Sequence, residues 1–219
     1  MRWYPLGLLA TLPLWLGGGP PGQGRERDAG TFLVTVNGAD AWREEFVVRD
    51  GRSPSRDGFT VEVRRFTGDA IAPTLLASAE LGPDSQPTGA EITDPGGGLR
   101  TFIQISKRRI TVRGVMPGGE SLREYPGADQ LLLADDSLVA WFAMAPRAGA
   151  ATVTVFQPRA ERSETLELVE SGTETNGLRH VVLGYGLAAV HLWFDPGGRL
   201  MKVERRSAGL LAIRTTATP

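Results

Sequence analysis

Hydrophobic and polar residues alternate with a period of two along most of the chain after residue 29. Thr31–Val36 is followed by Asn37-Gly38, a dipeptide typical of tight hairpin turns, and the apolar residues of Phe59–Val63 alternate with polar neighbours. Such alternation predicts antiparallel strands with one face on a core and the other in water. Comparable runs occupy residues 41–48, 74–81, 89–93, 99–106, 109–116, 121–125, 151–157, 164–171, 178–184, 187–194, 199–205 and 209–215.

Residues 131–146 lack this period. Apolar side chains recur there at helical spacing, at Leu138, Trp141, Phe142 and Ala145. Asp135 or Asp136 can cap a helix at its start, and Pro146 can end it. The pattern therefore predicts one short buried helix at about 136–145.

These elements predict an all-β fold with one short helix. A dozen or so antiparallel strands do not stay in a flat open sheet, because long sheets curl, split or close. We expect a single domain over residues 30–216, built as a strongly curled antiparallel sheet or incomplete β-barrel wrapped on the helix near 136–145. A two-sheet sandwich is the alternative.

Composition narrows the chemistry. The chain has 219 residues, a formal net charge of -1 and no cysteine, so disulfides, thiolate metal sites and cysteine nucleophiles are excluded. Basic residues are scattered rather than clustered, which argues against a nucleic-acid partner. The sequence predicts no cofactor.

The N-terminus resembles an export signal. Arg2 is followed by an apolar stretch, Trp3–Leu16, that is shorter than the ~20 residues of a membrane span, and then by small residues to Gly24. We expect a signal peptide at 1–24, a linker at 25–29 and a short tail at 217–219. The mature chain would then have no integral membrane span and a periplasmic or extracellular location. A retained N-terminal anchor or a disordered tail is the alternative.

Two glycine-rich segments resemble ligand loops. Asp195-Pro196-Gly197-Gly198 lies between two strand-like runs, whereas a phosphate loop would lead into a helix, so it is interpreted as a hairpin turn. The segment 184–189 matches the spacing G-x-G-x-x-A, but a strand rather than a helix follows it. Neither segment predicts nucleotide binding.

Catalytic and metal-binding patterns are sparse. A two-residue turn at Tyr185-Gly186 would place His180 opposite His191, and such a pair could share a metal, but no neighbouring carboxylate completes the site. Asp135, Asp136 and Ser137 are explained by helix capping. The sequence predicts a non-enzymatic protein, with His180 and His191 as weak metal candidates and a hydrolase as the third functional alternative.

The hairpin at 178–194 is apolar on both faces, so something should cover its second face. The predicted helix could cover it alone, or an apolar ligand could share the space. Side chains from both elements are therefore the candidate ligand-binding residues: Leu138, Trp141, Phe142, Val182, Ala189 and Trp193.

Two segments resemble exported bacterial families of unknown function. The run Trp193–Glu204, followed by Gly209–Arg214, is similar to their C-terminal strand pairs, and Ala134–Leu138 is similar to the start of their mid-chain helix. Those families are similar in fold to the periplasmic lipoprotein carriers LolA and LolB. The resemblance implies an unclosed barrel with an apolar cavity, and it implies no catalytic residues.

Together these patterns predict an exported binding module that holds a lipid-like, apolar or amphipathic small molecule inside its curled sheet. A structural or interaction domain with a fully packed interior is the main alternative.

Overall fold

The computed structural model describes residues 24–50, 58–145 and 151–215. In these ranges the chain forms fifteen strands of one continuous sheet. The first eight are β1 (Glu26–Val36), β2 (Ala39–Asp50), β3 (Phe59–Thr67), β4 (Leu75–Leu81), β5 (Pro87–Asp94), β6 (Leu99–Ile105), β7 (Arg109–Met116) and β8 (Gly119–Pro126). The other seven are β9 (Leu131–Leu133), β10 (Thr152–Gln157), β11 (Arg162–Thr173), β12 (Arg179–Leu183), β13 (Val190–Phe194), β14 (Leu200–Arg205) and β15 (Leu210–Thr215).

Strand β1 joins the two halves of the sheet. It pairs with β2 on one side and with β15 on the other, so the order runs from β8 through β1 and β15 to β9. Neighbouring strands are antiparallel, except that β9 runs parallel to β10. The chain therefore builds β1 to β8 as one meander, crosses to β9, and returns strand by strand to β1.

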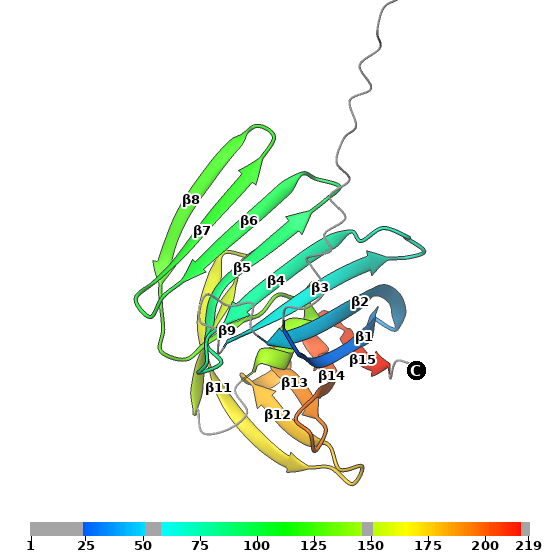
Figure 1. Ribbon diagram of the computed structural model, residues 1–219. Helices are drawn as coiled ribbons and strands as arrows, with labels where there is room; N and C mark the ends of the chain where they lie inside the picture. The colour runs from blue at the N-terminus through cyan, green and yellow to red at the C-terminus, as the bar shows by residue number, and fades with distance from the viewer. Residues whose placement is uncertain (1–23, 51–57, 146–150, 216–219) are drawn as a thin grey trace, which may run out of the picture.

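The sheet curls strongly and does not close into a barrel, as the sequence predicts (Figure 1). Its edge strands, β8 and β9, are not paired with each other. The edge at β9 instead approaches the turn before β5, where the Leu131 N–H donates to Gln86 Oε1 at 2.8 Å. Gln86 also contacts Gln130, with Nε2 3.4 Å from Oε1. The side chain of Gln86 thus links the β9 edge to the β4–β5 turn.

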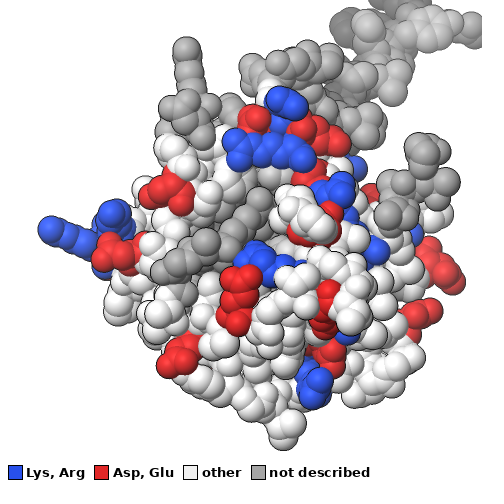
Figure 2. Space-filling model, turned by 90° about the horizontal axis from the view of Figure 1, so that it is seen from below, with Lys and Arg blue, Asp and Glu red and all other residues white. Residues whose placement is uncertain are grey.

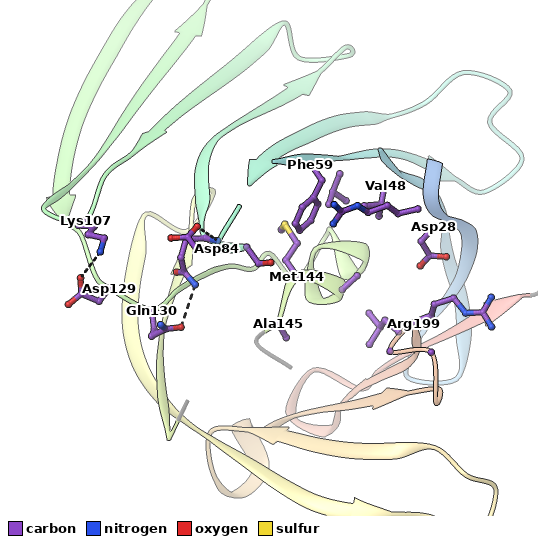
Figure 3. Close-up of a pocket in the computed structure, with 18 residues that line it drawn as sticks. Asp28, Val48, Phe59, Asp84, Lys107, Asp129, Gln130, Met144, Ala145 and Arg199 are labelled. Atoms are coloured by element: carbon purple, nitrogen blue, oxygen red, sulfur yellow. Dashed lines mark hydrogen bonds and ion pairs between the residues drawn. The ribbon is translucent and has the colours of Figure 1, made fainter. Parts of the chain in front are cut away.

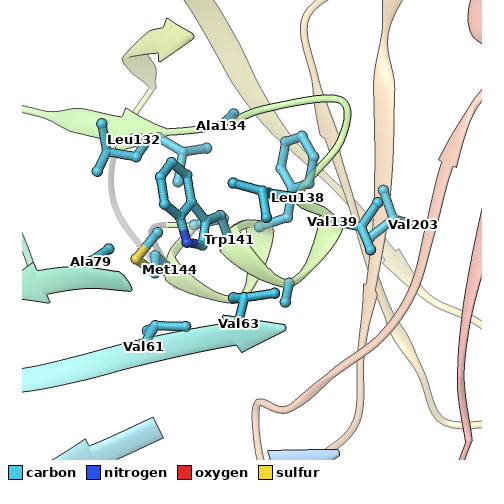
Figure 4. Packing of buried hydrophobic residues seen from close by; sticks show 14 of the residues in the cluster. Val61, Val63, Ala79, Leu132, Ala134, Leu138, Val139, Trp141, Met144 and Val203 are labelled. Atoms are coloured by element: carbon cyan, nitrogen blue, oxygen red, sulfur yellow. The ribbon is translucent and has the colours of Figure 1, made fainter. Parts of the chain in front are cut away.

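The inner face of the curl forms the core. Alternate residues of β1 to β4 are buried there, and Phe32 stacks on Phe46 with ring centroids 5.4 Å apart. The 3-10 helix η1 (Val139–Met144) lies inside the curl, and Trp141 at its centre is 0% exposed (Figure 4). A sheet of this curvature needs apolar filling, and η1 supplies it. Two further 3-10 turns, η2 (Gly186–Ala188) and η3 (Arg206–Ala208), connect strands.

The central helix is shorter and tighter than the sequence predicts. It covers 139–144 rather than 136–145, and its N-cap, Leu138, makes no side-chain cap bond. Asp135 accepts from the N–H of Ser137 instead, at 2.8 Å, and so shapes the preceding turn. The predicted stop at Pro146 lies outside the described residues.

Two other boundaries differ from the sequence predictions. Leu131–Leu133 is a strand, β9, that alternation could not reveal because all three side chains are buried. Residues 26–29, predicted as a linker, belong to β1. The predicted signal peptide falls outside the described residues except for Gly24, and the predicted tail at 217–219 falls wholly outside them.

Acidic and basic side chains are interspersed on the outer surface. On the face shown in Figure 2, Lys and Arg lie beside Asp and Glu rather than in areas of one sign. Within the described residues, no helix has the length and apolar character needed to cross a membrane.

Candidate functional site

A cleft of about 780 Å³ opens at one end of the curled sheet. Strands β2 and β3 form one wall, and the C-terminal end of η1 forms its back. The turns β4–β5 and β13–β14 border its mouth (Figure 3). Volumes of several hundred Å³ are typical of small-molecule sites, so the cleft is the principal candidate site among the described residues.

The inner part of the cleft is apolar. Val48, Val61, Met144 and Leu200 are each at most 9% exposed, and Phe59 is half-buried beside them. Alternation explains these positions, because Phe59 and Val61 share the inward face of β3. The lining can therefore accept an apolar group out of water.

The mouth of the cleft is charged, and several of its charged side chains form ion pairs. Asp28 accepts hydrogen bonds from both terminal nitrogens of Arg214, at 2.6 and 3.0 Å. Both side chains are largely buried. Arg27 pairs with Asp50, and Lys107 lies 4.0 Å from Asp129. The Asp28–Arg214 pair is fixed by burial, whereas Lys107 and Asp129 are exposed to water. The cleft is therefore amphipathic: apolar inside and polar at its entrance.

The Asp195–Arg199 turn forms part of this entrance. Asp195 accepts from the backbone N–H of Arg199 at 2.8 Å and from its guanidinium at 2.7 Å. Burial raises the pKa of Asp195. The hydrogen bonds and the positive charge of Arg199 together lower it by more, so the net pKa lies below the usual value. The predicted hairpin turn is confirmed, since it joins β13 to β14. Its glycines, Gly197 and Gly198, also border the cleft, which the sequence does not reveal.

Glu44 anchors the helix that backs the cleft. This β2 residue is 0% exposed, and its two carboxylate oxygens accept the backbone N–H groups of Val139 and Ala140, each at 3.0 Å. The indole N–H of Trp42 donates to the same carboxylate at 2.8 Å. Glu44 thus satisfies the first free N–H groups of η1, the role that the sequence analysis assigned to Asp135 or Asp136.

Burial raises the pKa of Glu44 from 4.5 to about 7, against the opposing effect of its hydrogen bonds from Ala140, Trp42 and Val139. The positive charge of Arg65 also lowers this pKa. The guanidinium itself is half-buried, and burial lowers its own pKa. The anchor of η1 is therefore a carboxyl group that titrates near neutral pH.

The six predicted ligand-binding residues do not lie together, and none of them lines the cleft. Leu138, Trp141 and Phe142 belong to the core on the inner face of the sheet. Val182 and Trp193 point to the outer face, because their neighbours Val181 and Leu192 are in that core. Ala189, just before β13, is buried but lies outside the core cluster.

The helix does not cover the second face of the hairpin, because the buried residues of η1 belong to the core on the other face. A small cluster of side chains lies on that face instead. Its members come from β12, β13, β14 and the β11–β12 turn. His180 stacks on Trp193 at 4.6 Å, the Lys202 ammonium lies 4.0 Å from the Trp193 ring, and the indole N–H donates to Glu174 at 2.6 Å. These contacts cover Trp193, which is 6% exposed, whereas Leu187 next to the same face is 77% exposed.

The two histidines are also displaced from their predicted pairing. His180 lies opposite Trp193, and His191 lies opposite Val182, a two-residue shift caused by the longer turn that contains η2. An even shift leaves both rings on the same face, where His180 Nε2 lies 3.0 Å from His191 Nδ1. Burial and the neighbouring His191 lower the pKa of His180. No cluster of three or more potential metal ligands is present in the described parts of the chain.

The Asp135-Asp136-Ser137 segment is tied to distant strands and turns. Ser137 receives a hydrogen bond from Arg159 at 2.9 Å, and Asp136 pairs with Arg205. Neither histidine contacts this set, in which Asp135 is buried and Asp136 is exposed. The segment fixes the approach of the chain to η1.

No protein-family model matches the chain, and no curated protein matches it. Among solved structures, it is similar to the crystal structure of a beta-barrel-like protein of a domain of unknown function (DUF1849) from Brucella abortus. The two are 10% identical with a TM-score of 0.44, over 86% of this chain and 95% of that chain. The fold assigned above rests on the strand pairing itself.

Proposed function

We propose that the protein is an exported, non-catalytic binding module that holds an apolar or amphipathic, lipid-like molecule in the cleft at the end of its curled sheet. The observation that carries this proposal is the cleft itself: about 780 Å³, apolar within and ringed by paired charges. An amphipathic ligand buries its apolar part against Val61 and Leu200 and leaves its polar part at the mouth. Burial at roughly 25 cal/mol per Å² then supplies the binding free energy.

Export is supported by the N-terminal pattern of Arg2, the apolar run that follows it and the small residues up to Gly24. Expression of the full chain in a bacterial host, with N-terminal sequencing of the product, tests it. Cleavage near residue 24 and recovery from the periplasm are expected. An intact Met1 in the cytoplasmic fraction would reject export without bearing on the cleft.

Binding is tested on purified protein with a fluorescent amphipathic probe, 1-anilinonaphthalene-8-sulfonate, and with native mass spectrometry of protein from its own host. Phe59→Ala should weaken probe binding several-fold, because Phe59 lines the cleft. Phe102→Ala is the matched control. Like Phe59, which lies under Arg27, Phe102 is half-buried and lies under an arginine, Arg100. It belongs to β6 and does not line the cleft. Equal effects of the two variants would reject the cleft as the binding site.

The alternative is a structural or interaction domain, and the seating of η1 favours it. Five of the six helix residues are buried, which shows that the centre of the curl is filled by the chain itself. A clean mass without a retained molecule, together with no probe binding, would support this alternative.

A further inference from the structure

The cleft ends close to a buried hydrogen-bond donor that has no acceptor. Three indole N–H groups lie in the described residues, and two of them donate to carboxylates: Trp42 to Glu44 and Trp193 to Glu174. The third, Trp141, is 0% exposed and its Nε1 has no hydrogen-bond partner among the residues described. A buried donor without an acceptor loses its hydrogen bonds to water and gains none in return, which destabilises the folded state. Such groups are rare enough in folded proteins to need an explanation.

Met144 connects Trp141 to the cleft. The two residues are three apart on η1, and side chains at this spacing of a 3-10 helix lie one above the other. Figure 4 shows the nitrogen edge of the Trp141 indole turned toward Met144. Met144 lines the cleft, as does Val61, which lies on the other side of the same space. The Met144 side chain therefore stands between the cleft and the unpartnered N–H.

Methionine is suited to such a position. Its unbranched side chain has three rotatable bonds and adapts to changes in packing at low cost. Rotation of Met144 toward the mouth would extend the cleft to Trp141 Nε1 without moving the backbone of η1. The helix itself need not leave the core, which would expose several large apolar side chains.

Water is a poor partner for this N–H. A buried water needs two to four polar partners, whereas the side chains around Trp141 in Figure 4, such as Ala79 and Leu132, are apolar. A carboxylate of a ligand is also a poor partner. It would be buried without a cation, and it would lie against η1, which already packs on the buried carboxyl group of Glu44. A neutral oxygen attached to an apolar body meets both conditions.

We propose that Trp141 Nε1 is a specificity-determining donor at the inner end of the cleft, where it binds a neutral oxygen acceptor of the ligand: an ester, a ketone or an alcohol. The proposal rests on the proposed function and narrows its ligand class. The molecule that binds enters with a neutral polar atom at its inner end, rather than with a hydrocarbon tail alone or a free carboxylate.

The test compares octane with 2-octanone by calorimetric titration of wild type and Trp141→Phe. The phenylalanine variant keeps an apolar ring but lacks the N–H. The ratio of 2-octanone to octane affinity should be about 2- to 12-fold higher in wild type than in the variant, the range expected for one neutral hydrogen bond. Trp193→Phe is the control, because it removes an indole N–H on the outer face and should leave the ratio unchanged.

A second measurement needs no core substitution. In wild-type protein labelled with 15N, the indole N–H resonance of Trp141 should shift when 2-octanone binds and stay in place with octane, while those of Trp42 and Trp193 stay fixed. If neither probe binds, the proposed function fails. If both bind with the same ratio in wild type and Trp141→Phe, and the Trp141 resonance does not respond, the donor role is overturned and the cleft remains a binding site.

Discussion

Glu44 shows how one polar side chain can organise an apolar interior. It faces inward from β2 in the same alternation as Trp42 and Phe46, and it is 0% exposed. An ionised carboxylate at such a place is costly unless donors surround it. Three N–H groups do so, two from the backbone of η1 and one from Trp42. Burial of Glu44 is unfavourable in itself, but its hydrogen bonds fix η1 to β2.

This arrangement predicts a particular pH dependence. The pKa of Glu44 is about 7 in the folded protein against 4.5 ordinarily, so between these values the folded state holds a proton that the unfolded state has lost. The stabilisation from protonation is full below about pH 4.5 and is lost as pH rises through 7. Glu44 should lower the free energy of unfolding by about 2–3 kcal/mol between about pH 5 and about pH 8.

Urea unfolding of wild type and Glu44→Gln at both pH values checks this. As pH rises, the free energy of unfolding of wild type should fall relative to that of Glu44→Gln. Glu164→Gln, which alters an exposed carboxyl group, should show no such change. A constant difference between wild type and Glu44→Gln across the pH range would contradict the prediction.

The place of Glu44 illustrates what the sequence can and cannot reveal. Alternation in 41–48 assigns it to the apolar face, so its burial could have been predicted, but its partners on η1 lie 95 and 96 residues away. The same holds for the cleft: Phe59 and Val61 are recognisable as inward-facing, whereas their meeting with Met144 and Leu200 depends on the curl of the whole sheet. Local patterns determine faces, and long-range pairing determines which faces meet.

The connections between strands explain the remaining errors of sequence interpretation. The Tyr185 turn was predicted as a two-residue loop, but a 3-10 turn lengthens it and shifts the pairing of β12 and β13 by two residues. Because the shift is even, every side chain kept its face, so the burial pattern survived an incorrect register. The short buried strand β9 had no alternation to detect.

One such connection is fixed by a glycine. Gly209 has φ of +60°, in the left-handed region, and a Cβ there would lie 2.0 Å from Asn37 Oδ1 and 3.1 Å from the backbone nitrogen of Asn37. Its carbonyl accepts the Asn37 N–H at 2.8 Å, which ties the β14–β15 connection to the β1–β2 turn. Gly209→Ala should therefore destabilise the protein by about 1–3 kcal/mol through backbone strain and crowding.

Thermal or urea unfolding measures this effect. Gly118→Ala in the β7–β8 turn is the matched control, because no atom lies within 4 Å of its added Cβ. It should change stability by less than about 0.5 kcal/mol, as surface substitutions usually do. Equal stabilities for the two variants would show that the Asn37–Gly209 contact is not maintained in solution.

The curled sheet as a whole depends on how its open seam is held. Sheet pairing ends at β8 and β9, and Gln86 connects the β9 edge to the turn before β5. Gln86→Ala leaves the N–H of the buried residue Leu131 without its acceptor. The free energy of unfolding should therefore fall by about 1–3 kcal/mol. The seam should also open more often.

Amide hydrogen exchange tests the seam directly. In Gln86→Ala the Leu131 amide should exchange about ten-fold faster or more, while amides of β1 and β15 in the middle of the sheet change only with global stability. Gln104→Ala, an exposed glutamine of β6, serves as the control. Unchanged protection of Leu131 would mean that another group holds the β9 edge.

The pairing of β1 with β15 also has a consequence for the time course of synthesis. Thr215 donates its hydroxyl to the carbonyl of Thr31, 184 residues earlier, so during synthesis the central strand of the sheet gains its second neighbour only after β15 has left the ribosome. Such distant partners slow folding. Until β15 has been synthesised, a nascent chain lacks the contact that unites its two halves, and the paired edge of β1 stays exposed to chaperones or to aggregation.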